Sequence, residues 1–168
     1  DAYSRWLRLL VAQALQDIAR DAEASQAGAE RLKQPALFLL DEFAALGRLE
    51  AVERAMGLMA GYGLQLWPIL QDMSQLKDLY GARANTFVAN AGVLQTFGVN
   101  DFETAKWLSQ MIGRETTGYQ TENHKPGDAP STSYNVTARD LMTPDEIMQI
   151  PPHVQLLRVQ GKPVIIAR

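Results

Sequence analysis

Hydrophobic residues along the chain follow two spacings, which predict helices and buried strands in alternation. In residues 3–20 they recur every three or four positions, as in an amphipathic helix: Tyr3, Leu7, Leu10, Val11, Ala14 and Ile18. Short continuous apolar runs have the character of strands buried on both faces, and they cover residues 35–40, 64–70 and 93–99. Helical patterns lie between and after these runs, over residues 49–60, 73–80, 84–91 and 100–112. This alternation predicts an α/β domain with a mostly parallel sheet flanked by helices.

The C-terminal third of the chain has a different pattern. Residues 118–133 are rich in Thr, Gly, Pro and Ser, which predicts a mobile exposed loop or the tip of a hairpin. Two apolar runs around Gly161, residues 154–159 and 163–167, predict a closing β-hairpin. With 168 residues we expect one domain, in four stretches. These are a leading helix and loop (1–34), the strands with their helices (35–117), a mobile loop (118–135), and a closing helix and hairpin (136–168).

Capping signals predict where two of the helices begin. Thr143 is followed by proline at the first helical position and by Glu146 at the third, which is the pattern of a capped helix start. Asn100 is followed three positions later by Glu103, a second capping pattern.

Composition excludes several classes of function. Sixteen basic and nineteen acidic residues leave a formal charge of −3, so any contact with nucleic acid must come from a local patch. The chain has no cysteine, which excludes disulfides, thiolate metal sites and a cysteine nucleophile. No apolar run approaches the roughly 18 residues of a membrane span. The chain begins at Asp1 directly on a helical pattern, so we expect it to be a piece of a longer protein.

Two adjacent carboxylates, Asp41 and Glu42, directly follow the first apolar run. Open α/β sheets bind ligands at the carboxyl ends of their strands. In phosphoryl-transfer ATPases, the aspartate of such a Walker B pair helps to hold Mg²⁺ and the glutamate orients or deprotonates the attacking water. The alternative is that the pair ends a strand and caps the next helix.

Gln71 follows the second apolar run, and neighbouring parallel strands would bring it to the same edge of the sheet as the carboxylates. A neutral amide there can hydrogen-bond both a γ-phosphate and a water molecule. The alternative is that Gln71 satisfies the backbone of its own loop.

The sequence has no phosphate-binding loop of the form G-x-x-x-x-G-K-[ST]. Without that loop a Walker-type ATPase cannot hold the phosphates of its nucleotide. Either the chain is not an ATPase, or the loop lies upstream of Asp1.

Several motifs resemble, in order, those of the coupling-protein ATPases of conjugation and type IV secretion, the TraG/TraD-like family. They are residues 37–49 (LFLLDEFAALGRL), 60–64 (AGYGL), 70–76 (LQDMSQL), 100–105 (NDFETA) and 141–147 (LMTPDEI). The resemblance implies that residues 1–168 are the C-terminal part of a RecA-like motor domain, without its phosphate-loop strand and with a C-terminal β-hairpin. The phosphate-binding loop and an all-helical insertion lie before this stretch in family members.

The resemblance further implies a hexameric ring on the cytoplasmic side of the bacterial inner membrane. The ring would use ATP and Mg²⁺ to drive single-stranded DNA, with relaxase or effector substrates, into the type IV secretion channel. Asp41 would hold Mg²⁺ through water, Glu42 would activate the attacking water, and Gln71 would sense the phosphate. The chain alone is expected to be inactive.

Some relatives place an arginine late in the helix after Walker B that is proposed to reach a neighbour's nucleotide, and this chain has no basic residue there. Arg48 and Arg54 are the nearby candidates for such a finger, against the alternative of solvated charges on a helix surface. Two other functions stay open: a different ring-forming DNA pump of the same superfamily, and a non-catalytic docking domain.

Overall fold

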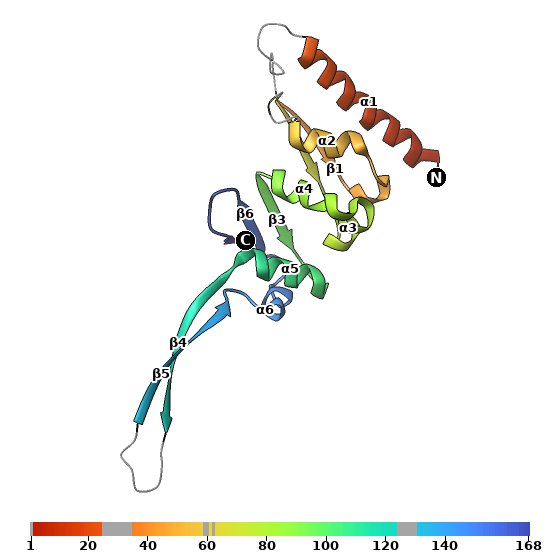
Figure 1. Cartoon of the computed structure of the whole chain (residues 1–168). Helices are drawn as coiled ribbons and strands as arrows, with labels where there is room; N and C mark the ends of the chain where they lie inside the picture. The colour runs from red at the N-terminus through yellow and green to blue at the C-terminus, as the bar shows by residue number, and fades with distance from the viewer. Residues whose placement is uncertain (1, 25–34, 59–60, 62, 124–130) are drawn as a thin grey trace. The chain divides into compact units, whose positions relative to one another are not determined.

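The computed structural model describes residues 2–24, 35–58, 61, 63–123 and 131–168. The chain divides into two compact units, residues 1–94 and 95–168. The first contains α1 (Ala2–Ala24), β1 (Ala36–Leu40), η1 (Phe43–Leu46), α2 (Glu50–Leu58), β2 (Leu64–Pro68), α3 (Met73–Tyr80), η3 (Gly81–Arg83) and α4 (Ala84–Asn90), and β3 (Val93–Phe97) begins at its end. The second contains α5 (Phe102–Ile112), β4 (Arg114–Asn123), β5 (Ser131–Asp140), α6 (Pro144–Met148), β6 (Gln155–Val159) and β7 (Ile165–Ala167) (Figure 1).

The first unit is built on a parallel pair of strands, β1 and β2, with Ala36 opposite Leu64 and Leu40 opposite Pro68. Pro68 is the last residue of β2, where its missing N–H removes no bond from the middle of the ladder. The parallel pairing predicted from the apolar runs is therefore present in these two strands.

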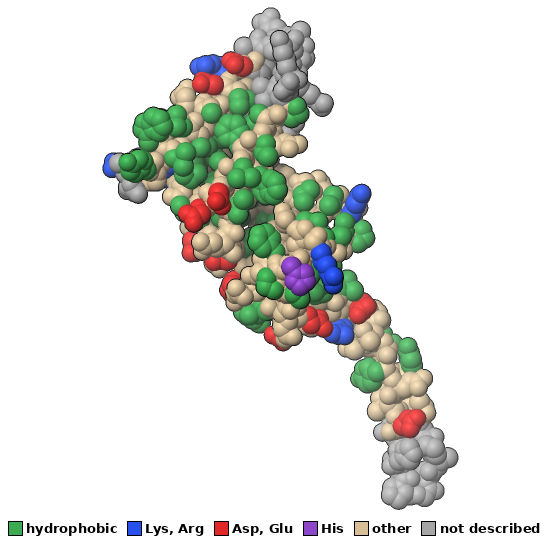
Figure 2. Space-filling model, turned by 180° about the vertical axis from the view of Figure 1, so that it is seen from behind, with side chains coloured by type: hydrophobic (Ala, Val, Ile, Leu, Met, Phe, Trp, Pro, Cys, Tyr) green, Lys and Arg blue, Asp and Glu red, His purple; other side chains and the backbone are tan. Residues whose placement is uncertain are grey.

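Burial of these strands on both faces is a prediction that the structure corrects. Along β1, exposed and covered positions alternate, and Leu37 and Leu39 are 53% and 54% exposed. Trp67 on β2 is 47% exposed. Figure 2 shows hydrophobic side chains gathered over one face of this unit. In the described part of the chain, therefore, only one face of the strand pair is well covered.

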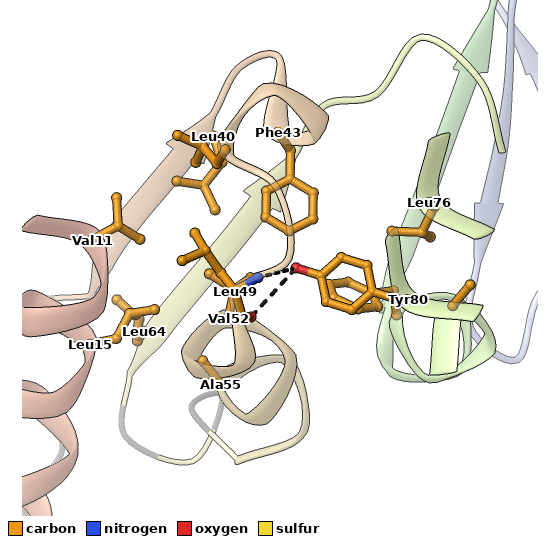
Figure 3. Close-up of a cluster of buried hydrophobic side chains, with 13 residues drawn as sticks. Val11, Leu15, Leu40, Phe43, Leu49, Val52, Ala55, Leu64, Leu76 and Tyr80 are labelled. Carbon is orange, nitrogen blue, oxygen red and sulfur yellow. Dashed lines mark hydrogen bonds between the residues drawn. The ribbon is translucent and has the colours of Figure 1, made fainter. Parts of the chain in front are cut away.

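The core of the first unit lies between this strand pair and the helices (Figure 3). Helix α1 contributes Val11 and Leu15, while Tyr3 at its start is 86% exposed. The predicted helix is present, but only the C-terminal part of its apolar stripe contacts the core, where Ile18 also packs.

Three aromatic rings join η1 to α3 and α4. Phe43 is fully buried, with its ring centroid 6.0 Å from that of Tyr80 and 5.8 Å from that of Phe87. The Tyr80 hydroxyl accepts a hydrogen bond from the Leu49 N–H at 3.0 Å and donates one to the Leu49 carbonyl at 3.4 Å (Figure 3). Burial raises the pKa of Tyr80 above its ordinary value of 10.0. The Tyr80 phenol is therefore neutral, and in this form it holds the backbone just before α2.

Residues 95–97 of β3 belong to the second unit, whose sheet has the order β3-β6-β7, and β6 and β7 form the predicted antiparallel hairpin. Its core contains Ala105, Leu108, Ile147 and Leu156.

Local capping sets both helix starts of this unit. Thr143 and Glu146 form the predicted capping box, and the backbone hydrogen bond from Thr143 is the main cause that lowers the pKa of Glu146. The N-cap of α5 is Asp101 rather than Asn100, because the Asp101 carboxylate accepts hydrogen bonds from the N–H groups of Glu103 and Thr104.

The polar segment over 118–135, for which the sequence predicts a mobile loop or the tip of a hairpin, belongs mostly to a β-hairpin. Strands β4 and β5 pair from Arg114 opposite Asp140 to Asn123 opposite Ser131, and the ribbon extends away from α5 and α6 (Figure 1). Residues 124–130 lie outside the described residues. The ring of Tyr134 lies over Gly118, since a Cβ on this glycine would come within 2.6 Å of the ring's Cζ. The Tyr134 side chain thus covers the space that Gly118, which has no side chain, leaves on the neighbouring strand.

Replacing Tyr80 with phenylalanine should lower the free energy of unfolding by about 1–3 kcal/mol, because it leaves the Leu49 amide without its partner. Since the pKa of Tyr80 is raised in the folded state, the contribution of its neutral phenol is complete below about pH 10 and is lost as the pH rises through the folded-state pKa. Urea denaturation at several pH values measures both effects.

The matched control is Tyr119→Phe, since Tyr119 is 54% exposed on the hairpin. Equal losses of stability in the two variants would contradict the role assigned to Tyr80.

Candidate functional site

The carboxyl ends of β1 and β2 lie side by side, and two hydrogen bonds continue their pairing beyond the strands. The Ile69 N–H donates to the Leu40 carbonyl at 2.9 Å, and the Phe43 N–H donates to the Ile69 carbonyl at 3.0 Å. These bonds enclose Asp41 and Glu42 on one strand and lead to Gln71 on the other. The structure therefore brings the three predicted site residues to one edge of the sheet.

Glu42 has an unusual backbone conformation. With φ 46° and ψ 44° it is left-handed, and it is the single non-glycine residue with positive φ among the residues that the structure describes. An L-residue with a Cβ in this region costs roughly 1–2 kcal/mol. Such strain persists only where the surroundings impose it, and it is concentrated at functional sites.

Buried packing holds this turn in place. The residue after Glu42 is Phe43, whose ring packs against those of Tyr80 and Phe87, and these two rings also contact each other with centroids 4.6 Å apart. The Asp41 carboxylate accepts a hydrogen bond from the Glu42 N–H at 3.0 Å. Phe43 is thus anchored in the core while the side chains of Asp41 and Glu42 stay exposed.

The capping alternative for the carboxylate pair receives no support. Glu42 occupies the N-cap position of η1, but its side chain makes no capping hydrogen bond. The Asp41 carboxylate bonds to the N–H of its sequence neighbour rather than to a helix N–H.

Gln71 is positioned by the first turn of α3. Its N–H donates to the Gln75 side-chain oxygen at 3.1 Å, and the Gln75 amide donates to the Gln71 side-chain oxygen at 3.4 Å. Asp72 caps the same helix by accepting from the Gln75 N–H at 2.9 Å. Gln75 was not predicted from the sequence, although an aspartate followed three positions later by glutamine is a recognisable capping signal.

The donor set at this edge suits Mg²⁺ more than a tightly bound transition metal. Mg²⁺ keeps several water ligands and is usually bound through one or two carboxylates together with substrate phosphates. Asp41 offers such a carboxylate at an exposed position. No group of three or more His, Cys, Asp or Glu side chains suited to a metal occurs within the described ranges.

Arg48 and Arg54 lie elsewhere in the first unit. Both line a pocket between α1 and α2 whose lining includes none of Asp41, Glu42 and Gln71. Arg48 also lies 3.8 Å from a carboxylate oxygen of Glu53. The structure therefore groups the two arginines with each other rather than with the carboxylate pair.

Comparison with known proteins places the whole chain in one family. The family model described as type IV secretory system conjugative DNA transfer matches residues 2–168. Conjugal transfer protein TraG of Escherichia coli is 33% identical over 128 residues, and protein VirD4 of Rhizobium rhizogenes is 31% identical over 137 residues. The alignments cover 71% and 79% of this chain but 20% of each relative, so the chain spans about one fifth of the length of these relatives.

Solved structures of the bacterial conjugative coupling protein TrwB have the same fold. The unbound monoclinic form of TrwBdeltaN70 has a TM-score of 0.70 at 20% identity, covering 94% of this chain and 35% of that one. TrwB in complex with the non-hydrolysable ATP analogue ADPNP has a TM-score of 0.68 at 22% identity, covering 98% and 37%. The predicted RecA-like α/β fold is confirmed. None of the helices described here is long and apolar enough to cross a membrane.

The strain at Glu42 can be measured by comparing two variants that both remove its carboxylate. Glu42→Gly should be more stable to urea than Glu42→Ala by about 1 kcal/mol, because glycine adopts the left-handed conformation without steric cost. If the alanine variant equals or exceeds the glycine variant in stability, residue 42 does not occupy the strained conformation.

Proposed function

The chain belongs to the type IV secretory system family of conjugative DNA transfer proteins, and from this premise we propose that it carries the water-activating part of an ATPase site in a conjugative coupling protein. The observation that carries the proposal is the left-handed Glu42 at the carboxyl end of β1, beside the end of β2. A strained acidic residue at the ligand-binding edge of a parallel sheet fits a catalytic role.

Each residue at this edge has a separate role in the proposal. Glu42 accepts a proton from the attacking water, and Gln71 donates and accepts hydrogen bonds at the phosphate side of that water. Asp41 holds Mg²⁺ through a water ligand, and the ion, when bound, neutralises charge on the phosphates. TrwB, which has been solved with ADPNP and also with ADP and Mg²⁺, supports the assignment of ATP and Mg²⁺ as cofactors.

The phosphates of ATP need a cradle that this sequence does not provide, since it has no G-x-x-x-x-G-K-[ST] motif. In the proposal, residues outside these 168 supply it, in a protein with the length of the curated relatives. That protein assembles as a hexameric ring at the inner membrane and moves single-stranded DNA, with relaxase or effector proteins, into the secretion channel. The names of the relatives, conjugal transfer proteins among them, support this context.

The alternative of a non-catalytic docking domain is the less favoured one. A docking surface has no need of a non-glycine residue at φ 46°, and the capping role that would make the carboxylates structural is not observed.

In a coupling protein that contains this chain and a phosphate-binding loop, Glu42→Gln should lower ATP turnover by a factor of about 10²–10⁴ while nucleotide binding is retained, because the amide cannot accept the proton. Steady-state phosphate release and equilibrium binding of a fluorescent nucleotide measure the two properties. The matched control is Glu103→Gln, an exposed glutamate on α5. Unchanged turnover in Glu42→Gln would remove Glu42 from its role.

The 168-residue chain alone should not hydrolyse ATP, because it has no loop to hold the phosphates. The test compares phosphate release by the wild-type chain with that by its Glu42→Gln variant. Turnover that depends on Glu42 in the isolated chain would show that the phosphates are held by residues within it.

A further inference from the structure

Three arginines surround one pocket in the first unit, apart from the edge that carries Asp41 and Glu42. The pocket has a volume of about 400 Å³ and lies between α1 and the segment that leads into α2. It is lined by Arg8, Ala12, Gln16, Arg48, Leu49, Glu50, Ala51 and Arg54. A volume of this size falls within the range of small-ligand sites.

Arg8 is fixed in position by the backbone on the opposite side. Its guanidinium donates to the Leu46 carbonyl at 2.6 Å and to the Arg48 carbonyl at 3.0 Å. It passes so close to Gly47 that a Cβ there would lie 2.6 Å from its Nη1 atom, and Gly47 has a φ of +67°. The side chain is therefore held before any ligand binds, and the loop has a glycine where the arginine crosses it.

The positive charge around the pocket is only partly compensated by nearby carboxylates. Arg8 bonds to neutral carbonyls, and the Arg54 side chain has no hydrogen bond or ion pair among the described residues. Arg48 is 3.8 Å from Glu53, a carboxylate that also pairs with Arg83 at 3.0 Å. The residues that line the pocket include three arginines and one acidic residue, Glu50. This local excess of positive charge occurs in a chain whose net charge is −3. The guanidinium groups in this concave surface repel each other, and a bound anion would reduce that repulsion.

We propose that this pocket binds a phosphate group. Guanidinium groups match phosphate oxygens with paired hydrogen bonds, and several can share one phosphate. The phosphate can come from the backbone of a nucleic acid or from a free nucleotide, because both present the same chemistry to Arg8, Arg48 and Arg54. Ala12 and Ala51, which also line the pocket, have small apolar side chains.

The test titrates the 168-residue chain with pyrophosphate, ADP and a short oligothymidylate, with isothermal calorimetry at low salt as the readout. Arg54→Glu should raise the Kd of the ligand that binds by about tenfold or more, because it replaces an attractive charge with a repulsive one in the pocket. Lys77→Glu is the matched control: it makes the same change in net charge at an exposed position of α3 outside the pocket, and it should leave the Kd within about twofold.

Two further variants separate geometry from charge. Arg54→Lys keeps the charge but removes the paired donors, so it should weaken binding less than Arg54→Glu does. Gly47→Ala changes no charge but collides with Arg8, so it should also weaken binding. Circular dichroism of each variant shows whether the fold is retained.

Binding of the oligonucleotide without binding of pyrophosphate or ADP identifies a nucleic-acid backbone as the source, and competition by ADP identifies a free nucleotide. The proposal is overturned if no probe binds at millimolar concentration, or if Arg54→Glu and Lys77→Glu have equal effects. It is also overturned if an oligoglutamate peptide binds more tightly than every phosphate probe, because the pocket would then be a site for carboxylates.

Discussion

The parallel pairing of β1 with β2 is the constraint on which the candidate site depends. This pairing does not stop at the last strand residues, because the Leu40 carbonyl and the Phe43 N–H both bond to Ile69. Asp41 and Glu42 are the two residues between these bonds, so the chain must turn sharply within them. A parallel pair also brings both carboxyl ends to the same edge, which is where ligands of open α/β sheets bind. The backbone ladder thus creates both the location of the site and the strain at Glu42.

That strain persists because the residues after it are anchored independently. Phe43 is buried against Tyr80 and Phe87, and Tyr80 in turn holds both backbone groups of Leu49. Relaxing Glu42 toward a right-handed conformation would require moving Phe43 out of this cluster. A buried large aromatic side chain is worth several kcal/mol, more than the roughly 1–2 kcal/mol cost of one left-handed residue. The core therefore determines the conformation of the turn that carries Asp41 and Glu42.

The elements that could be predicted from the sequence are those with short-range signals. The capping box at Thr143, the helix from Met73 to Tyr80 and the apolar strands β1 and β2 needed no knowledge of distant residues. Residues 118–133 were left open between a loop and the tip of a hairpin, because Thr, Ser and Gly are typical of loops while Thr and Tyr also favour strands, and only the cross-strand partners decide. Burial on both faces of β1 was also wrong, since a continuous apolar run shows that a strand is hydrophobic but not what covers it.

The candidate site shows the same division between local and long-range information. Strand ends and polar residue types were enough to predict Asp41, Glu42 and Gln71, but the left-handed turn depends on Ile69, 27 residues beyond Glu42 in the sequence. Arg8 was unpredictable for the same reason: its partners Leu46 and Arg48 are 38 and 40 residues away. These contacts fix η1 from both ends, through Phe43 at its start and through the Leu46 carbonyl at its finish. A change at either end therefore acts on the same four residues, so a variant of Arg8 must be checked for the geometry of Glu42 before any loss of function is assigned to charge.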